Sequence, residues 1–328
     1  MLPELVEELR SALGVVQKRE IQVAARALPR LRGGPWGTGE VRIGDDTAAI
    51  PDGAGGYLLL AAEGMWPELV ASEPRFAGFC AVLVNVSDVY SMGGRPLAMV
   101  DALYAGSAAA AEPILAGMAD AAARLDVPIV GGHTNLHSPY PALAAAILGR
   151  ARRLLTSFDA RPGDDLVAAF DLRGAMHPRH AFWNAATDAP AERLRADYAI
   201  LPRLADEGLC AAAKDISMGG LVGTTLMLLE GSGVGATLEL DAIPRPTGVP
   251  WGRWLLAFPS YGFVLAVPPE RSARVSAAFA ARDLAAAVVG RVEPGHQLVL
   301  RAGRERLPLW NLQDAPLTGF GPREGEAT

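Results

Sequence analysis

The stretch that decides the fold is VRIGDDTAAI, residues 41–50, in which Asp45 and Asp46 stand side by side after Gly44. Adjacent carboxylates repel each other, so a fold that keeps both between apolar segments usually gathers cations around them. Magnesium and phosphate are the partners that this pair predicts. A Gly-Asp-Asp turn between two strands explains the same tripeptide, so the pair alone leaves both interpretations open.

Length and composition favour a globular protein of two domains. The chain has 328 residues, which exceeds what one hydrophobic core usually supports, and 50% of them are hydrophobic. The net charge is −6, and no basic run suggests binding of nucleic acid or anionic lipid. We therefore expect neither nucleic acid nor a membrane as partner.

Three further features concern location and surface chemistry. The N-terminus carries acidic residues, and no apolar run reaches membrane-spanning length, so we expect a cytoplasmic protein. Cys80 and Cys210 lie far apart without metal-binding spacing, which predicts two buried thiols. The only lysines are Lys18 and Lys214. We expect chance placement for Lys18, whereas Lys214 adjoins a motif described below.

The first half of the chain predicts a helix at about 4–28, a mobile loop over 30–39, and then a domain with the order β-β-α-β-α-β. The expected strands are 47–50, 57–62, 96–105, a buried strand 127–131, and 142–150. The expected helices run from Pro74 to the glycines Gly93 and Gly94, and over 108–125. We place the domains at 1–39, 40–155 and 156–328.

The second half predicts another mixed α/β domain, so the fold class is α+β with two mixed domains. The expected strands are 166–171, a short strand ending at Ile216, 234–240, 262–267, 286–292 and 297–301. The expected helices are 178–188, 191–206, 218–231 and 269–282. Neither half contains the glycine pattern of a dinucleotide domain or of a P-loop.

Three further motifs carry polar residues at element ends. Asn85 and Asp88 share one helix face beside the double glycine, although a polar face with a glycine cap explains them equally well. His133 follows Gly131 and Gly132 at a strand end, where a structural histidine is the simpler interpretation.

The third motif, Asp215-Ile216-Ser217-Met218-Gly219-Gly220, leads from a strand into a helix. Amides at a helix N-terminus attract anions, and glycines allow a phosphate to approach. A helix cap made by Asp215 or Ser217 is the alternative.

In this order, the motifs resemble the superfamily of aminoimidazole ribonucleotide (AIR) synthase, thiamine-monophosphate kinase, selenophosphate synthetase and the hydrogenase maturation carbamoyl dehydratase. GDDTA is similar to the Gly-Asp-Asp-Ala-Ala segment of that family, and DISMGGL is similar to its Asp-Ile/Val-Ser/Thr-x-Gly-Gly-Leu turn. The remaining similar segments are NVSD at 85–88, MGGRP at 92–96, GGHT at 131–134 and VGRV at 289–292. The chain looks most like an uncharacterised branch related to AIR synthase.

The resemblance implies an N-terminal sheet that pairs across a homodimer into a barrel, a C-terminal α/β sandwich, and ATP with Mg²⁺ between the domains. The metal ligands that it implies are Asp45, Asp46, Glu63, Asp88 and Asp215. The nucleotide-binding residues are Gly44, Asn85, Gly93, Gly94, Gly131, Gly132, Ser217, Gly219 and Gly220. Lys214 would touch a phosphate, and His133 would be an acid–base group or a substrate contact.

The chain also departs from the family pattern. Glu63 stands where kinase-like members have Asp after the second strand, and His133 and Met218 also replace Asp. These changes argue against thiamine-monophosphate kinase activity, and residues 1–39 lack the arm of selenophosphate synthetases.

The main hypothesis is an ATP- and Mg²⁺-dependent enzyme that phosphorylates a small molecule or activates its amide or carboxyl oxygen. A non-catalytic dimeric nucleotide-binding protein that serves a partner enzyme is the alternative. A transition-metal centre with His133 and Glu63 is a minor third.

Overall fold

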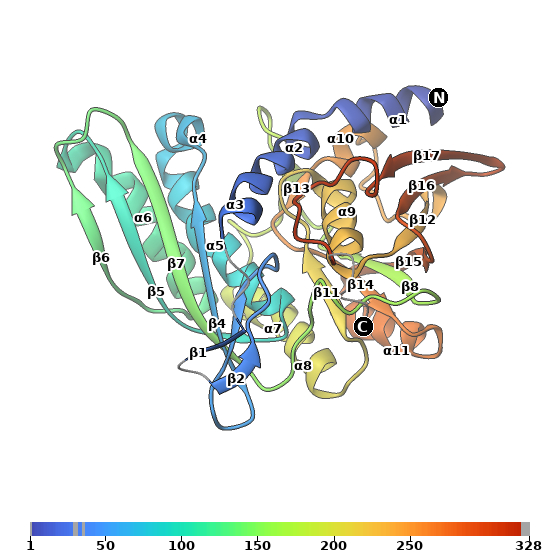
Figure 1. The fold of residues 1–328 in the computed structure, drawn as a ribbon. Helices are drawn as coiled ribbons and strands as arrows, with labels where there is room; N and C mark the ends of the chain where they lie inside the picture. The colour runs from blue at the N-terminus through green and yellow to red at the C-terminus, as the bar shows by residue number, and fades with distance from the viewer. Residues whose placement is uncertain (1, 29–31, 35–36, 323–328) are drawn as a thin grey trace.

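The computed structural model describes residues 2–28, 32–34 and 37–322 and shows two lobes, each built on a β-sheet with helices (Figure 1). This arrangement confirms the prediction of two mixed α/β domains. Within the described residues, no helix is both long enough and apolar enough to cross a membrane.

The N-terminal domain is a five-stranded sheet in the order β3-β4-β7-β5-β6. Its strands are β3 Ala48–Pro51, β4 Tyr57–Gly64, β5 Arg95–Tyr104, β6 Ile129–Asn135 and β7 Ala142–Ala151. Its helices are α4 Pro67–Ser72, α5 Pro74–Ser91 and α6 Ala108–Leu125. Only β5 and β6 pair in parallel. The β-β-α-β-α-β order is confirmed up to β6 with the addition of α4, and β7 follows as a fifth strand at the range expected for it.

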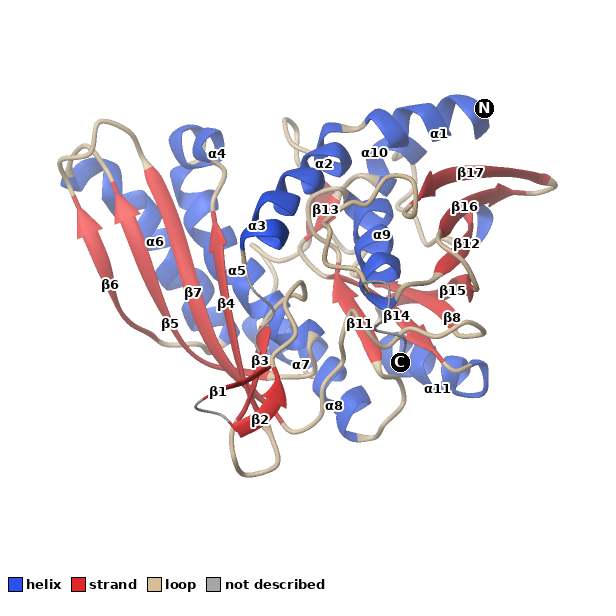
Figure 2. Cartoon of the chain, in the orientation of Figure 1, coloured by secondary structure: helices blue, strands red, loops and turns tan. Residues whose placement is uncertain are grey.

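The two faces of this sheet differ. Helices α5 and α6 cover one face (Figure 2), and their apolar side chains form a core with inward residues such as Leu59 and Ile147. The other face leaves large apolar side chains exposed on four strands, namely Leu60, Leu97, Val100, Val130 and Leu148. β6 begins two residues later than the strand predicted over 127–131 and extends to Asn135, and the prediction that this strand is buried is wrong.

The C-terminal domain is a seven-stranded sheet in the order β11-β14-β8-β15-β12-β16-β17. Its strands are β8 Asp165–Phe170, β11 Ala212–Asp215, β12 Gly235–Glu239, β14 Gly262–Val267, β15 Ala285–Glu293, β16 Gln297–Ala302 and β17 Glu305–Asn311. Its helices are α7 Ala191–Tyr198, α8 Ile200–Asp206, α9 Gly220–Ser232, α10 Trp251–Leu255 and α11 Pro269–Ala280, and a 3₁₀ turn spans Leu240–Ala242.

Helices α9 and α11 cover opposite faces of this sheet. Alternate residues of β8 show it, because Val167 belongs to the core that contains Phe279 of α11, whereas Ala168 belongs to the core that contains Leu226 of α9. The first of these cores continues into the N-terminal domain, so the two lobes share one apolar interface.

The N-terminal segment lies on the C-terminal domain (Figure 1). It consists of α1 Leu2–Ser11, α2 Leu13–Val16, a 3₁₀ turn over Gln17–Ile21, and α3 Gln22–Ala27. Two short strands follow, β1 Arg32–Gly34 and β2 Gly37–Glu40, which pair antiparallel. The loop predicted over 30–39 is thus wrong for these residues, and its other positions lie outside the described ones.

The helix predicted over 178–188 is also wrong. The segment instead carries β10 Phe182–Asn184, between β9 Ala175–Met176 and β13 Phe258–Pro259 in a small sheet. The buried rings of Phe182 and Trp183 pack in the core, and the Asn184 side chain accepts from the amides of two following residues. An Asx turn of this kind competes with a helix.

Candidate functional site

Three carboxylates from distant parts of the chain converge where the domains meet. Asp46 lies in the turn before β3, Asp88 in the last turn of α5, and Asp215 at the end of β11. One oxygen from each lies within 4.8 Å of the other two. Two of these acids come from the N-terminal domain and one from the C-terminal domain, so the cluster exists only when the domains are docked.

Asp46 is held firmly in this cluster. Its Oδ1 accepts an ion-paired hydrogen bond from Lys214, and its Oδ2 accepts from Ser91 Oγ at 2.6 Å and from the Asp215 amide at 3.1 Å. Lys214 is buried beside three carboxylates, and despite the cost of burial its pKa is raised by Asp46, Asp45 and Asp215. Lys214 therefore stays charged and fixes one oxygen of Asp46.

Buried oxygen atoms without partners occur on Asp88 and on residues close to the clustered acids in the chain. Within the described part of the chain, Thr47 Oγ1, Asn85 Oδ1 and Asp88 Oδ2 are buried and receive no hydrogen bond. Burial, reinforced by neighbouring carboxylates, raises the pKa of both Asp88 and Asp215 well above the usual range. A hard cation that prefers oxygen ligands would satisfy these atoms and favour their ionised form, so the residues fit Mg²⁺.

Asp45 points elsewhere. Its Oδ2 accepts from the Ser157 amide at 2.8 Å, and its Oδ1 accepts from Ser157 Oγ at 2.5 Å and from the amide of Asp46 at 2.9 Å. Burial raises the pKa of Asp45 to about 6 although Lys214 opposes the shift. Asp45 thus ties the turn to the segment that follows β7, and it is not among the three converging acids.

Gly44 explains why this turn can form. Its φ of +110° suits glycine, and a Cβ there would lie 2.5 Å from Phe320 Cβ. The C-terminal segment is held in turn by the buried Glu230 carboxylate, which accepts from the backbone at Leu317 and Thr318. The Gly-Asp-Asp turn is therefore packed against the end of the described chain.

Glu63 lies on β4 with an exposed side chain. Its charge interacts with those of Lys18, Asp46 and Lys214, but it is not one of the three clustered acids.

The Ser-Met-Gly-Gly turn is only partly free to bind an anion. The Ser217 amide already donates to Thr224 Oγ1 at 3.2 Å, and the Gly220 amide donates to the Ser217 carbonyl at 2.9 Å. Helix α9 has Gly219 at its N-cap and no side-chain cap, so neither Asp215 nor Ser217 plays the capping role of the alternative.

The other glycines predicted to bind the nucleotide either allow close packing or lie away from the carboxylate cluster. A Cβ on Gly93 would lie 2.7 Å from Ala205 Cβ in the other domain, and one on Gly94 would lie 2.3 Å from Leu59 Cδ1. Gly131, Gly132 and His133 lie on β6, exposed. This edge strand is three strands away from β4 in the sheet order, or roughly 14 Å. Within one chain, the structure does not bring His133 to the carboxylates.

Sequence reasoning missed three contributors to the site, namely Lys18, Ser91 and Ser157. The amine of Lys18 donates to Ser217 Oγ at 3.3 Å. Burial and the nearby Lys214 lower the pKa of Lys18, while Asp215, Glu63 and Asp46 oppose the shift. The rarity of lysine was the one available signal, because both lysines of the chain lie at this site.

A second cluster, of Glu73, His177 and His180, bridges the domains at the N-terminus of α5. Its geometry is that of an ion-pair network. Glu73 accepts from Arg179 at 2.6 Å and lies 3.1 Å from His177 Nε2. His177 Nδ1 accepts from two backbone amides, which makes Nε2 the protonated nitrogen. The two imidazole rings stack with an interplanar angle of 17°, so their in-plane lone pairs do not converge on one ion.

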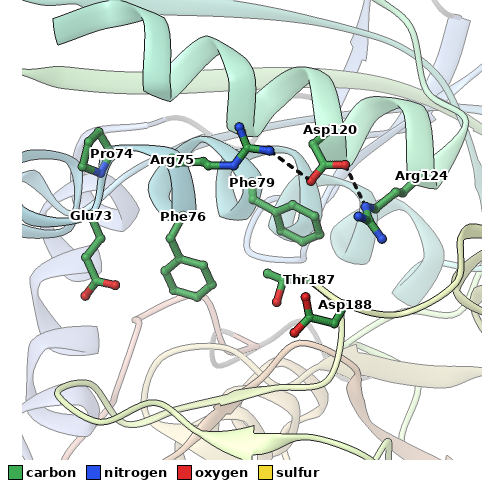
Figure 3. Close-up of a pocket in the computed structure, with 10 residues that line it drawn as sticks. Glu73, Pro74, Arg75, Phe76, Phe79, Asp120, Arg124, Thr187 and Asp188 are labelled. Carbon is green, nitrogen blue, oxygen red and sulfur yellow. Dashed lines mark hydrogen bonds and ion pairs between the residues drawn. The ribbon is translucent and has the colours of Figure 1, made fainter.

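A pocket of about 570 Å³ lies beside this network (Figure 3). Phe76 and Phe79 line it, and Asp120 in its wall pairs with both Arg75 and Arg124. Phe79 precedes Asp88 by nine residues of α5, or roughly 14 Å along the helix. The pocket is therefore separate from the carboxylate cluster.

The comparisons with known proteins agree with this architecture. Residues 44–151 match the family model for the N-terminal domain of AIR synthase related proteins, and residues 173–303 match the model for the C-terminal domain. An uncharacterised protein of Synechocystis is 53% identical over 98% of this chain and 99% of its own length. The selenide, water dikinase of Myxococcus xanthus is 28% identical over 63% of this chain and 61% of its own.

The structure of Thermotoga maritima PurL complexed with ATP is similar in fold, with a TM-score of 0.73 and 22% identity. The match covers 93% of this chain and 51% of that one, so this chain corresponds to about half of PurL. Two matched domains in the expected order, and a near full-length relative, establish the family. The chain belongs to the AIR synthase-related family.

Proposed function

We propose that this protein is an ATP- and Mg²⁺-dependent enzyme that transfers a phosphoryl group to a small molecule or activates its amide or carboxyl oxygen. The observation that carries the proposal is the Asp46–Asp88–Asp215 cluster, in which one oxygen of Asp88 is buried without a partner, beside the charged Lys214. Phosphoryl transfer needs positioned charge more than covalent chemistry from the protein.

The residues have distinct roles in this proposal. Asp88 and Asp215, with the second oxygen of Asp46, would hold Mg²⁺, which supplies the positive charge that neutralises the phosphates. Lys214 keeps Asp46 in place through its ion pair and adds a fixed positive charge at the domain boundary. The buried setting strengthens these interactions, because little water screens them.

The named relatives support the nucleotide. The PurL structure is a complex with ATP, and the name of the Myxococcus protein describes a dikinase. A fold that serves such proteins, combined with a carboxylate cluster between its domains, favours ATP as the phosphoryl donor here.

We also propose a homodimer formed by the open face of the N-terminal sheet. That face exposes Leu60 on β4 to 49%, Leu148 on β7 to 37%, Leu97 on β5 to 45% and Val130 on β6 to 66%, so the four successive strands all contribute. Contiguous apolar surface of this kind marks an interaction site. Pairing with a second copy would cover it and give the barrel that the family resemblance implies.

Thermal unfolding with a non-hydrolysable ATP analogue tests the nucleotide site. The analogue with Mg²⁺ should raise the melting temperature of the wild type, and Asp215→Asn should remove this shift. Arg301→Ala, an exposed residue paired with Glu239 far from the site, is the control. If Mg²⁺ with the analogue does not raise the melting temperature of the wild type, the proposal is refuted.

Release of ADP distinguishes an enzyme from a non-catalytic nucleotide-binding protein. A non-catalytic nucleotide-binding protein would show the same thermal shift without ADP release against any acceptor. The site itself does not name the acceptor, so the assay uses pools of carboxylates, amides and amines with detection of ADP.

A further inference from the structure

We propose that Lys18 binds the terminal phosphate of the nucleotide and that residues 13–21 form a fixed wall of the site. This inference rests on the proposed function, and it concerns a segment that precedes both matched family domains. It adds a phosphate contact that recognises a triphosphate over a diphosphate.

The backbone of the N-terminal segment touches the glycine turn. A Cβ on Gly14 would lie 3.1 Å from the Gly219 nitrogen, and a Cβ on Gly219 would lie 2.9 Å from the Gly14 carbonyl. Gly219, with a φ of +94°, therefore leaves no room for a side chain, and Gly14 leaves little. The buried Val15 adds an apolar anchor to the core around α9. The segment is therefore fixed against the turn.

Lys18 follows Gly14 by about one helical turn and so projects over the same motif. Its Nζ donates to Ser217 Oγ at 3.3 Å. The acids Asp215, Glu63 and Asp46 act on its charge from farther away. For the residues that the structure covers, no ion pair to Lys18 is found within 4.0 Å. The hydrogen bond that the described structure gives its amine is therefore to a neutral hydroxyl.

The two lysines therefore differ in what they can bind. Lys214 is committed to Asp46, whereas Lys18 is partly buried and has donors to spare. A lysine ammonium with free donors, placed near a cation site, binds phosphate as a point charge. Ser217 positions the amine, and a phosphate held by the carboxylate-bound Mg²⁺ would receive the remaining hydrogen bonds.

Titration calorimetry on the full-length protein tests the role of Lys18 in the presence of Mg²⁺. We expect Lys18→Ala to weaken binding of a non-hydrolysable ATP analogue by about tenfold to hundredfold, the usual loss for a charged hydrogen bond. The affinity for ADP should change by less than about threefold. Lys18→Arg should retain most of the affinity, and Arg26→Ala, which changes an exposed arginine outside residues 13–21, should match the wild type.

A purely structural role for Lys18 predicts a different result. If Lys18→Ala only displaced the N-terminal segment, it would weaken binding of the ATP analogue and of ADP equally and would lower the melting temperature. That result would overturn the inference. Unchanged affinity of Lys18→Ala for the ATP analogue would also overturn it, and would leave the proposed function intact. Failure of the wild type to bind either nucleotide would instead remove the proposed function.

A lysine-directed probe tests the same point in the wild type, independently of any variant's folding. An acyl phosphate of ATP carries its reactive carbonyl at the terminal phosphate and acylates a nearby amine. Because the chain has two lysines, peptide mapping resolves the site directly. We expect labelling of Lys18 that excess ATP analogue suppresses, and labelling of Lys214 without Lys18 would overturn the assignment.

Discussion

Replacing Asp88 by Asn should stabilise the metal-free protein and abolish its stabilisation by Mg²⁺. Asp88 is buried, its Oδ2 lacks a hydrogen-bond partner within the described chain, and burial among other carboxylates raises its pKa. An unsatisfied buried acceptor costs about 1–3 kcal/mol, and more when it is charged. We expect Asp88→Asn to raise the free energy of unfolding by about this amount at pH 7.

The contribution of Asp88 to the free energy of unfolding changes with pH in a defined direction. Because the folded-state pKa of Asp88 lies above the unfolded value of about 3.8, the protonated acid favours the folded state. Its contribution to stability is fully present below about pH 3.8 and is lost as the pH rises through the raised pKa. The advantage of Asp88→Asn over the wild type should therefore grow with pH, and the variant should show a shallower loss of stability.

Magnesium binding offsets this advantage of the variant. At a Mg²⁺ concentration of 100 times its dissociation constant, binding adds about 2.7 kcal/mol to the wild type. The variant should gain almost nothing. Urea unfolding at pH 7 with a chelator measures the stability of the metal-free protein, and the same experiment with Mg²⁺ measures the gain from metal binding.

Asp101 provides a matched control, because its Oδ2 is also a buried acceptor without a partner in the described structure and burial also raises its pKa. Asp101 lies on β5 and does not belong to the cluster. Asp101→Asn should keep the full Mg²⁺ effect. The reasoning is refuted if Asp88→Asn destabilises the metal-free protein, or if it keeps the wild-type response to Mg²⁺.

Three other substitutions test the supporting structure. Ser157→Ala removes the hydroxyl that donates to Asp45, and urea unfolding should show a loss of about 1–3 kcal/mol. Leu97→Glu should convert a dimer to a monomer in light scattering, whereas Leu115→Glu, on the exposed side of α6, should not. Gly14→Val should displace the N-terminal segment, cost about 1–3 kcal/mol and increase its cleavage by protease.

Elements with local boundary signals could be predicted closely from the sequence. The helix expected over 108–125 matches α6 at both ends, because Ser107 caps its first turn and Asp126 ends it with φ of +56°. The helix expected over 178–188 failed because its residues are set by β13, which lies more than 70 positions away in the chain. Pairing over such a distance leaves no local pattern.

The residues of the site also divide into those with a local sequence signal and those placed by long-range contacts. The four motifs could be found because each is a short polar segment at an element end, and the structure brings Asp46, Asp88 and Asp215 together. The partner of Asp45 and the position of His133 depend on domain docking and on strand order, which the motifs do not encode. Lys18 lies 199 residues from the serine that it contacts, so only the tertiary structure connects them.

The placement of charge explains why the site forms between domains. The N-terminal domain supplies Asp46 and Asp88, the C-terminal domain supplies Lys214 and Asp215, and the Lys214–Asp46 ion pair crosses the boundary. Breaking a buried pair leaves an uncompensated charge, which is strongly destabilising. The same pair therefore locks the domains together and leaves Asp88 and Asp215 facing each other with raised pKa values. A cation bound there would relieve the repulsion that docking creates, so the proposed metal binding and the docking of the domains would stabilise each other.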